Sequence, residues 1–443
     1  MPGSPAAADG GRVGAETLTC VLGDLQIGGV PRLYIDILTR LQQAGVATRI
    51  VAPDGTLRPL AQERGIAWEP IDWTESRLAT YERVRSLLAP GGRALVTADP
   101  AIVHVMPALA AAGPAAAVFH GTAPRLPDWF GEARLARLVR LVSELERAGR
   151  LRVLTIGSTY VEEYARLFEL PVERIALLAP GVDSAAIEFR PVAGPVRSVL
   201  SLCRLSPEKA PHVLAAVELV AEGLAQGRAC HLDVVGDGPW RAEAEAVCER
   251  RLPPGSWTFH GATTAPLDAM RRADAVLATG LTALEAASAG VRVVIVRTTP
   301  DDAGPLGPVM TRARYQALAR DSFGARSQPP AAPRDVWADL DAVGIEELAA
   351  VRAAVDANNS LAVTAETLVE AFASLGRPPL EPAAGGVGAA AAALEDELSR
   401  VQRLADEIWA ARVRFEAERD QLLAERDARS TARSDQPGRG PST

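Results

Sequence analysis

Lysine is almost absent from this chain. Of its 47 lysine and arginine residues, one is a lysine, Lys209, and the remaining 46 are arginines. The abundance of alanine and arginine is typical of a GC-rich coding bias, which accounts for the scarcity of lysine but not for the place of the one that remains. We therefore ask what position 209 requires that a guanidinium does not supply.

Cysteine and histidine are also scarce. The four cysteines, Cys20, Cys203, Cys230 and Cys248, show no CxxC spacing, and the five histidines are dispersed. Structural zinc sites and disulfide frameworks need such residues at short, regular spacings. The sequence therefore supports neither class of site.

Long apolar runs and a basic charge balance are missing as well. The chain has no apolar run of the length that spans a bilayer, and its first 16 residues lack the apolar stretch of a signal peptide, so they are expected to form a disordered tail. The net charge is −8, whereas nucleic-acid-binding proteins usually carry a basic face. These features predict a cytoplasmic protein without a nucleic-acid partner, and leave peripheral contact with the inner membrane face open.

Short apolar runs alternate with helical patterns along most of the chain. With 443 residues, more than one core is expected. The alternation predicts parallel βαβ units in an α/β fold, with a helix from Pro31 to about Gly45 and a break at 184–196 that separates two runs. We expect two facing doubly wound, Rossmann-like domains, at 17–190 and 191–332. The strands are predicted in TLTCVLG, ATRIVAP, RALVTA, AAAVFH, RVLTIG and IALLAP, and then in VRSVLSLC, CHLDVVG, WTFHG, AVLAT and VRVVIV, each of the second group with a helix after it.

The C-terminal part is predicted to be helical. Residues 333–376 should form helices that close the second domain, with Ser360 as a cap, followed by a linker at 377–393. At 394–428, apolar residues recur every four and three positions, which indicates either a coiled coil, with a homodimer through 394–422, or a single helix that docks on its own chain. The last residues, 429–443, are expected to be disordered.

Ligands of doubly wound sheets bind beyond the carboxyl ends of the strands. In SLCRLSPEKAPH, Arg204 follows a strand and Lys209 opens a helix, so both should point into the crevice between the domains. Two cations at a helix N-terminus form an anion site, because the free N–H groups and the helix dipole add to their charge. Lysine offers a compact point charge and arginine a planar fork, and a narrow pocket around a diphosphate favours the former. The alternative is that both are surface charges.

Two more turns follow predicted strands of the second domain. In VVGDGPWR, Gly236 and Gly238 permit a tight turn, but the dinucleotide fingerprint GxGxxG is absent. In FHGATT, His260 and Gly261 could approach a flat base, or His260 could be a loop histidine with local hydrogen bonds only.

The last of these turns lies in ATGLTALEAASAG. Thr282 and Glu285 have the spacing of a capping box, in which the glutamate bonds the Thr282 N–H. Alternatively, Glu285 accepts hydrogen bonds from a ribose diol, while the N–H groups of Leu281 and Thr282 hold phosphate oxygens.

Taken together, these turns resemble those of the retaining GT-B glycosyltransferases of family 4. SLCRLSPEKA, LDVVGDGPWRAEAE, ALEAASAGVRVVIV and LLAPGVDSAAIEFRP are similar to four family motifs in their order. The resemblance covers roughly 17–375. It implies a GT-B fold and transfer of a sugar from a nucleotide-diphosphate sugar to an acceptor hydroxyl, with retention of configuration. No metal or other cofactor is expected if Arg204 and Lys209 neutralise the diphosphate, because no DxD-like carboxylate pair is placed in a turn to hold a metal.

The resemblance also implies roles for individual residues. Arg204 and Lys209 would bind the donor diphosphate, and Glu285 the ribose. His120, at the end of AAAVFH, would contact the donor sugar; the alternative is a structural turn histidine. The implied catalytic residues are His120, Arg204 and Lys209, and the implied donor-binding residues are Gly28, Gly29, Arg204, Lys209, Gly236, Gly238, His260, Gly280, Leu281, Thr282 and Glu285.

The sequence departs from the family at several positions. Leu277 stands eight residues before Glu285, where the family has a second glutamate that contacts donor-sugar hydroxyls, and the loop around Gly280 is shorter. Backbone groups near Gly280 and Thr282 are candidates to contact the donor-sugar hydroxyls in place of that second glutamate. Milder changes are Ala210 after the lysine and Arg292 before Val–Val.

Two other functions stay open at this point. One is an epimerase of the same fold acting on the nucleotide-sugar alone, and the other is a catalytically inactive, nucleotide-sugar-binding partner protein. The acceptor is not identified: a sugar, a glycan, a lipid-linked acceptor or a small natural product would all fit. Trp129 and Phe130 could stack on it or belong to the core.

Overall fold

The computed structural model describes residues 17–88, 92–97, 105–106, 108–109, 113–127, 131–298 and 304–375. Of these, 17–73 and 83–375 lie in one compact unit, and Thr74–Glu82 belongs to another. The expected tails, the linker and the helix at 394–428 lie outside the described residues, as do Trp129 and Phe130.

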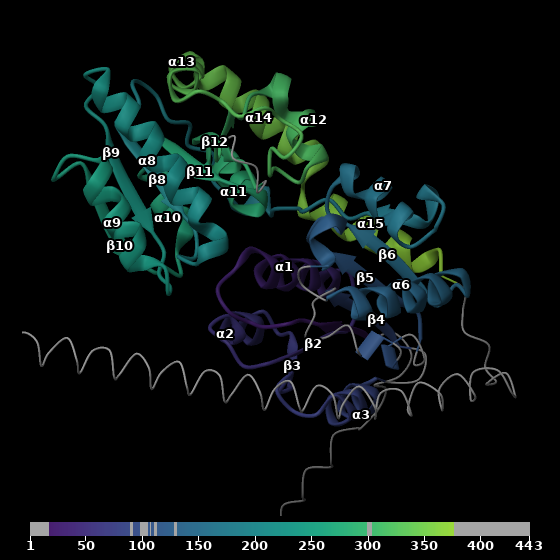
Figure 1. The fold of residues 1–443 in the computed structure, drawn as a ribbon. Coiled ribbons are helices and arrows are strands. Elements are labelled where there is room, and N and C mark those ends of the chain that lie inside the picture. The colour runs from purple at the N-terminus through teal and green to yellow at the C-terminus, as the bar shows by residue number, and fades with distance from the viewer. Residues whose placement is uncertain are drawn as a thin grey trace, which may run out of the picture. The chain divides into compact units, whose positions relative to one another are not determined.

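The first half of the chain forms a seven-stranded parallel sheet (Figure 1). Its strand order is β3-β2-β1-β4-β5-β6-β7, the doubly wound arrangement. The edge strand β3, in AWEP, is an element that sequence patterns did not predict, because it is short and not apolar. The strands are β1 (Leu18–Val21), β2 (Thr48–Ala52), β3 (Ala67–Pro70), β4 (Arg93–Thr97), β5 (Ala115–Phe119), β6 (Leu151–Thr155) and β7 (Ile175–Leu177), and the helices α1 (Gly29–Gln43), α2 (Arg58–Glu63), α3 (Arg77–Leu87), α6 (Glu132–Arg147) and α7 (Ser158–Leu167).

The second half forms a six-stranded sheet in the order β10-β9-β8-β11-β12-β13. Five strands are parallel and β13 pairs antiparallel with β12. The helix expected directly after VRVVIV is therefore wrong, because the chain returns along β12 as a strand first. The strands are β8 (Ser198–Leu202), β9 (His231–Val235), β10 (Trp257–Gly261), β11 (Ala275–Ala278), β12 (Arg292–Val296) and β13 (Leu306–Val309), and the helices α8 (Ala210–Ala225), α9 (Arg241–Arg251), α10 (Pro266–Arg271), α11 (Gly280–Ala289) and α12 (Arg312–Arg320).

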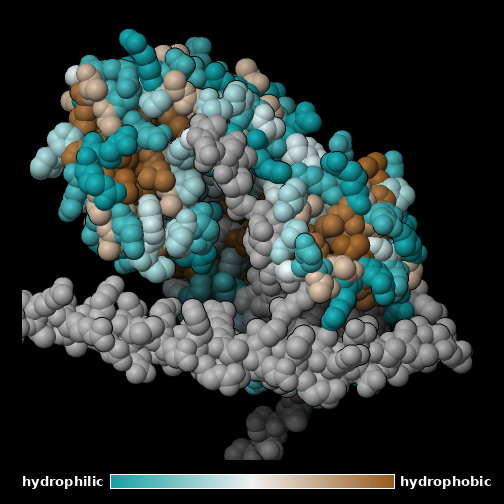
Figure 2. All heavy atoms as spheres, viewed as in Figure 1, coloured by the Kyte–Doolittle hydropathy of each residue, from teal (hydrophilic) through white to brown (hydrophobic). Residues whose placement is uncertain are grey.

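The central strands of both sheets are buried on both faces, which explains their near-continuous apolar runs, whereas the edge strands β3 and β10 are partly exposed. Alternate residues of one strand enter different cores: Val21 packs into one and Cys20 into the other, and Leu277 and Val276 divide in the same way. On the face shown in Figure 2, apolar atoms gather in small areas interrupted by polar ones. The burial of the central strands on both sheet faces confirms the predicted α/β architecture.

Three helices follow at the C-terminal end of the described chain: α13 (Pro333–Ala342), α14 (Ile345–Asn358) and α15 (Leu361–Ala373). Ser360 caps α15, as predicted, by accepting a hydrogen bond from the Val363 N–H. Helix α13 packs on α8 and α14 on α11, but α15 packs on α1 and enters a core of the first sheet. The prediction that residues 333–376 close the second domain does not hold for α15, which returns to the first sheet. None of the described helices combines the length and apolar character needed to cross a bilayer.

The turn after β9 requires its two glycines for reasons of packing. Gly236 and Gly238 have φ angles of 149° and 150°, which side chains other than glycine rarely adopt. A Cβ atom on Gly236 would lie 1.8 Å from the Cys203 carbonyl oxygen, and one on Gly238 would lie 2.2 Å from that of Leu205. The turn is thus pressed against the backbone that follows β8, where the Leu205 N–H donates to the Asp237 carbonyl.

Gly236→Ala is expected to lower the free energy of unfolding by about 3 kcal/mol, because the methyl group meets backbone and the φ angle becomes strained. Chemical denaturation measures this change. The matched control is Gly344→Ala, at a position with open space around the glycine and an ordinary φ of −95°. Equal effects of the two substitutions would contradict the packing argument.

Candidate functional site

The turns after β8 and β11 meet at the point where the strand order of the second sheet reverses. Lys209 is the N-cap residue of α8 and closes a short 3₁₀ turn (Pro207–Lys209). His212, in the first turn of α8, is 4% exposed, and its Nε2 lies 3.5 Å from the Oγ1 of Thr279. Thr279 is the N-cap residue of α11, so the N-termini of α8 and α11 are neighbours.

The Lys209 charge acts on this neighbourhood. Burial, aided by the Lys209 ammonium, lowers the pKa of His212 to about 3, so the imidazole is neutral at pH 7. Burial raises the pKa of the Cys203 thiol to about 11, and Lys209 opposes that rise. The local positive charge is therefore supplied by Lys209 and by the N-terminal ends of two helices, which together favour an anion.

The connection from β11 to α11 consists of Thr279 alone. Leu277 lies within β11 and is fully buried in a core, so it is not a loop residue that stands in place of an acidic one. Gly280 has a φ of 55° and donates its N–H to the Phe323 carbonyl at 3.3 Å. That N–H is thus engaged by the protein, whereas Leu281 and Thr282 lie in the first turn, where N–H groups have no acceptor within the helix.

The first turn of α1 packs against α11. A Cβ atom on Gly29 would lie 3.8 Å from the Leu281 Cβ, and one on Gly28 would lie 3.7 Å from the Pro31 Cδ. These are ordinary contact distances, and Gly28 is extended with a φ of −178°. Backbone geometry does not require glycine here, which distinguishes this pair from Gly236 and Gly238 and suits a surface kept free for a ligand.

Glu285 lies in the middle of α11 and is half-buried. Burial raises the pKa of its carboxyl to about 7; Arg32 on α1 opposes this rise and Asp36 adds to it. Because the N-cap residue of α11 is Thr279, Thr282 is already helical, and the capping-box interpretation of Thr282 and Glu285 is wrong. The Glu285 carboxyl thus lies beyond the helix start, near enough to α1 for the charges of Arg32 and Asp36 to act on its pKa.

His120 follows β5 and contacts Tyr34 of α1. Its Nε2 lies 2.9 Å from the Tyr34 Oη, and the two rings meet edge to face with centroids 5.6 Å apart. Burial lowers the pKa of His120 to about 4, so its imidazole is neutral over the physiological range. Tyr34 is itself fully buried and therefore fixes the orientation of the histidine ring.

Two predicted site residues are bound elsewhere. The Arg204 guanidinium pairs with Glu208 at 3.1 Å, and both side chains are about half exposed. The His260 Nε2 lies 2.6 Å from the Asp233 Oδ1 on the neighbouring strand, within β10 rather than beyond it. Lys209, Thr282, Glu285 and the Gly28–Gly29 turn thus lie on elements that contact one another. Arg204 and His260 pair with Glu208 and Asp233.

Sequence reasoning missed four residues of this arrangement: Arg32, Tyr34, His212 and Thr279. His212 carried a signal, because it lies one helical turn after Lys209 in the same stretch. Tyr34 and Arg32 gave none, since the contact of Tyr34 with His120 and the effect of Arg32 on the pKa of Glu285 depend on the three-dimensional fold. Within the described residues, no group of three or more His, Cys, Asp or Glu side chains is placed to hold a metal ion.

Glu285→Gln is expected to stabilise the protein at pH 8 more than at pH 5, by about 2 kcal/mol. The raised pKa means that the folded state favours the neutral carboxyl, so stability present at low pH is lost as the pH rises through 7. The variant lacks this loss. Thermal unfolding of both proteins at both pH values measures the difference, and a pH-independent difference would contradict it.

Comparisons with known proteins place the fold. No family model matches the chain, and no curated protein matches it in sequence. Solved structures do match. HepE from Anabaena, in complex with UDP and glucose, has a TM-score of 0.63 and 16% identity over 81% of this chain and 100% of its own.

Two further structures are similar. A glycosyltransferase from Rickettsia africae has a TM-score of 0.56 and 15% identity, covering 82% of this chain and 98% of its own. TarM from S. aureus, in a complex that contains UDP, has a TM-score of 0.54 and 10% identity, covering 81% and 99%. Together with the two doubly wound sheets, these matches establish a GT-B fold of two Rossmann-like α/β domains.

Proposed function

We propose that this protein transfers a sugar from a nucleotide-diphosphate sugar to an acceptor hydroxyl, as a metal-independent, retaining enzyme similar to family 4. One observation carries the proposal: the N-termini of α8 and α11 adjoin at the strand-order reversal, next to the chain's only lysine, and Glu285 of the same α11 faces α1. The UDP and glucose in the HepE structure support a donor of this class.

The leaving diphosphate gains negative charge as the glycosidic bond breaks. In the proposal, Lys209 and the first-turn N–H groups of α11 stabilise that charge as it develops. Removing one such preorganised group typically costs about 2.7–4 kcal/mol, or roughly a hundred- to thousand-fold in rate. The Arg204 guanidinium is paired with Glu208 and can add a second cation when that exposed pair opens.

Glu285 and His120 bind the two ends of the donor in this scheme. A carboxylate with two acceptor oxygens suits the vicinal hydroxyls of a ribose, and the donor's hydroxyls would replace the water that burial removes from Glu285. His120 is neutral, so it contacts sugar hydroxyls by hydrogen bonds and does not act as a general base that titrates near pH 7. Tyr34 holds its ring in place.

Retention of configuration and independence of metal are the finer parts of the proposal. Retention rests on the resemblance in sequence motifs, and independence of metal rests on neutralisation of the diphosphate by Arg204 and Lys209. Product anomer analysis tests the first, and turnover with a chelator tests the second. Donor incubated without acceptor separates transfer from epimerisation. The acceptor is proposed only as a hydroxyl compound, and the proposed homodimer depends on residues 394–422, outside the described chain.

Lys209→Ala is expected to lower the turnover number by a hundred-fold or more, because the leaving diphosphate loses its main counter-charge. The fold should be unchanged by circular dichroism. Arg250→Ala, which removes an exposed cation from α9 in the same domain, is the matched control and should retain activity. Wild-type rates in Lys209→Ala would overturn the assigned role.

The variant Lys209→Arg tests whether position 209 requires a lysine or accepts any cation. A planar guanidinium beside the buried His212 cannot reproduce a compact point charge, so we expect a loss of at least ten-fold in turnover. Near-normal activity would mean that coding bias, and not geometry, left one lysine in the chain.

A further inference from the structure

The segment between α12 and Gln328 has an unusual backbone. Ser322, Phe323 and Ala325 adopt φ angles of 51°, 57° and 44°, although none is a glycine. Such conformations cost of order 1–3 kcal/mol each and persist only where the surroundings fix them. Here the fixing contacts include the Thr298 N–H, which donates to the Gly324 carbonyl, and the fully buried ring of Phe323. We call residues 320–327 the strained loop.

The strained loop holds the start of α11. The Phe323 carbonyl accepts the Gly280 N–H at 3.3 Å, and the Ser322 carbonyl oxygen lies 3.9 Å from where a Gly280 Cβ would be. Because Thr279 is the only residue between β11 and α11, the position of Gly280 sets where α11 begins. The strained loop therefore determines the placement of the helix N-terminus to which the donor diphosphate is assigned.

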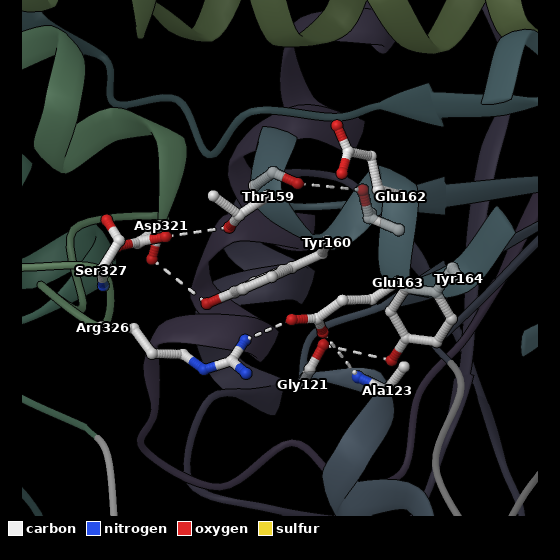
Figure 3. A network of polar contacts seen from close by, with 12 residues as sticks. Gly121, Ala123, Thr159, Tyr160, Glu162, Glu163, Tyr164, Asp321, Arg326 and Ser327 are labelled. Carbon is white, nitrogen blue, oxygen red and sulfur yellow. Dashed lines mark hydrogen bonds and ion pairs between the residues drawn. The ribbon is translucent and has the colours of Figure 1, made fainter. Parts of the chain in front are cut away.

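The opposite side of the strained loop contacts α7 of the first half of the chain (Figure 3). Thr159 Oγ1 donates to the Arg320 carbonyl at 3.0 Å, and the Tyr160 hydroxyl donates to the Asp321 carbonyl at 3.2 Å. A Cβ atom on Gly157, at the start of α7, would lie 2.7 Å from the Arg320 carbonyl oxygen, so the glycine permits this close approach.

An ion pair strengthens the same contact. The Arg326 Nη1 lies 2.8 Å from the Glu163 Oε1, with the side chains 26% and 17% exposed, and the guanidinium also lies 5.8 Å from the centroid of the Tyr160 ring. A partly buried, charge-assisted hydrogen bond of this kind is stronger than an exposed ion pair.

Helix α7 also holds the chain that follows His120. The second carboxylate oxygen of Glu163, Oε2, accepts the Ala123 N–H at 3.2 Å. The hydroxyl of Tyr164, the next residue, donates to the Gly121 carbonyl at 3.1 Å. Figure 3 shows Glu163 between these groups and Arg326. One side chain thus contacts the segment after His120 and the strained loop at once.

We propose that Glu163 is a positioning residue for the transfer proposed above, because its two carboxylate oxygens tie the segment after His120 to the strained loop that places the N-terminus of α11. This inference rests on the proposed function. In it, Glu163 touches neither donor nor acceptor. Glu163 fixes the position of His120, which contacts the sugar, relative to the helix N-terminus that binds the diphosphate. Both groups then contact the same donor molecule.

The activity test uses Glu163→Gln. The amide oxygen can still accept the Ala123 N–H, but the charge facing Arg326 is lost. A displacement of about 1 Å in a catalytic group can cost roughly a hundred-fold in rate, so we expect turnover to fall at least ten-fold with a smaller change in donor KM. The double variant Glu163→Gln with Arg326→Gln offers an amide pair in place of the ion pair and should recover most of the loss.

The matched control is Asp341→Asn. It removes the charge from another ion pair, Arg228–Asp341 with an N–O distance of 2.6 Å, which joins the chain after α8 to α13. We expect it to lower the melting temperature as much as Glu163→Gln does while turnover stays within two-fold. If Glu163→Gln behaved like this control, losing stability but not turnover, the positioning role would be overturned.

Hydrogen exchange of the unliganded protein separates this inference from the proposed function. In Arg326→Gln, amide exchange should rise at least three-fold both in the peptide containing Ala123 and in that containing Gly280. A rise in amide exchange confined to the peptide around residue 326 would contradict the connection through Glu163. If exchange rises at both places but wild-type protein turns over no donor with any acceptor, the proposed function fails, and with it the positioning role, while the physical tie stands.

Discussion

The packing of the first turn of α1 against the first turn of α11 is the contact on which the candidate site depends. It brings Gly29 to Leu281 and sets Glu285 in the field of Arg32. Five residues after Gly29, α1 also carries Tyr34, which orients His120 after β5. One helix of the first sheet thereby organises residues from three separate turns. Because α11 starts one residue after β11, small changes at its N-terminus move the assigned diphosphate and ribose contacts together.

The environment of Lys209, the chain's only lysine, is the second feature of the candidate site. Lys209 caps α8 beside a buried, neutral His212, whose other contact is Thr279 at the cap of α11. The histidine links the two helix ends without adding charge, so the cation is concentrated at one side chain. Arg204, five residues earlier, is already paired with Glu208 at the surface. A compact ammonium at the junction of two helix N-termini is a physical reason for lysine at position 209.

The sequence predicted the fold because strands buried on both faces leave long apolar runs, such as VRVVIV. It missed β3, which has four residues, none of them fully buried, and β13, which returns antiparallel. It placed the candidate site in turns that follow apolar strands directly, and that location stays a prediction. It did not separate Gly236 and Gly238, required by the backbone at Cys203 and Leu205, from Gly28 and Gly29, which are not. Partners such as Tyr34 depend on folding, and no spacing encodes them.

The most direct test of the central claim is a thermal-shift titration of the wild-type protein with nucleoside diphosphates and nucleotide-diphosphate sugars. A ligand at a hundred times its dissociation constant adds about 2.7 kcal/mol to apparent stability. That free energy corresponds to a rise of roughly 3 °C in a chain of this size. The account predicts such a rise with at least one diphosphate nucleotide and its sugar conjugate. No shift with any of them, at millimolar concentration, would contradict it.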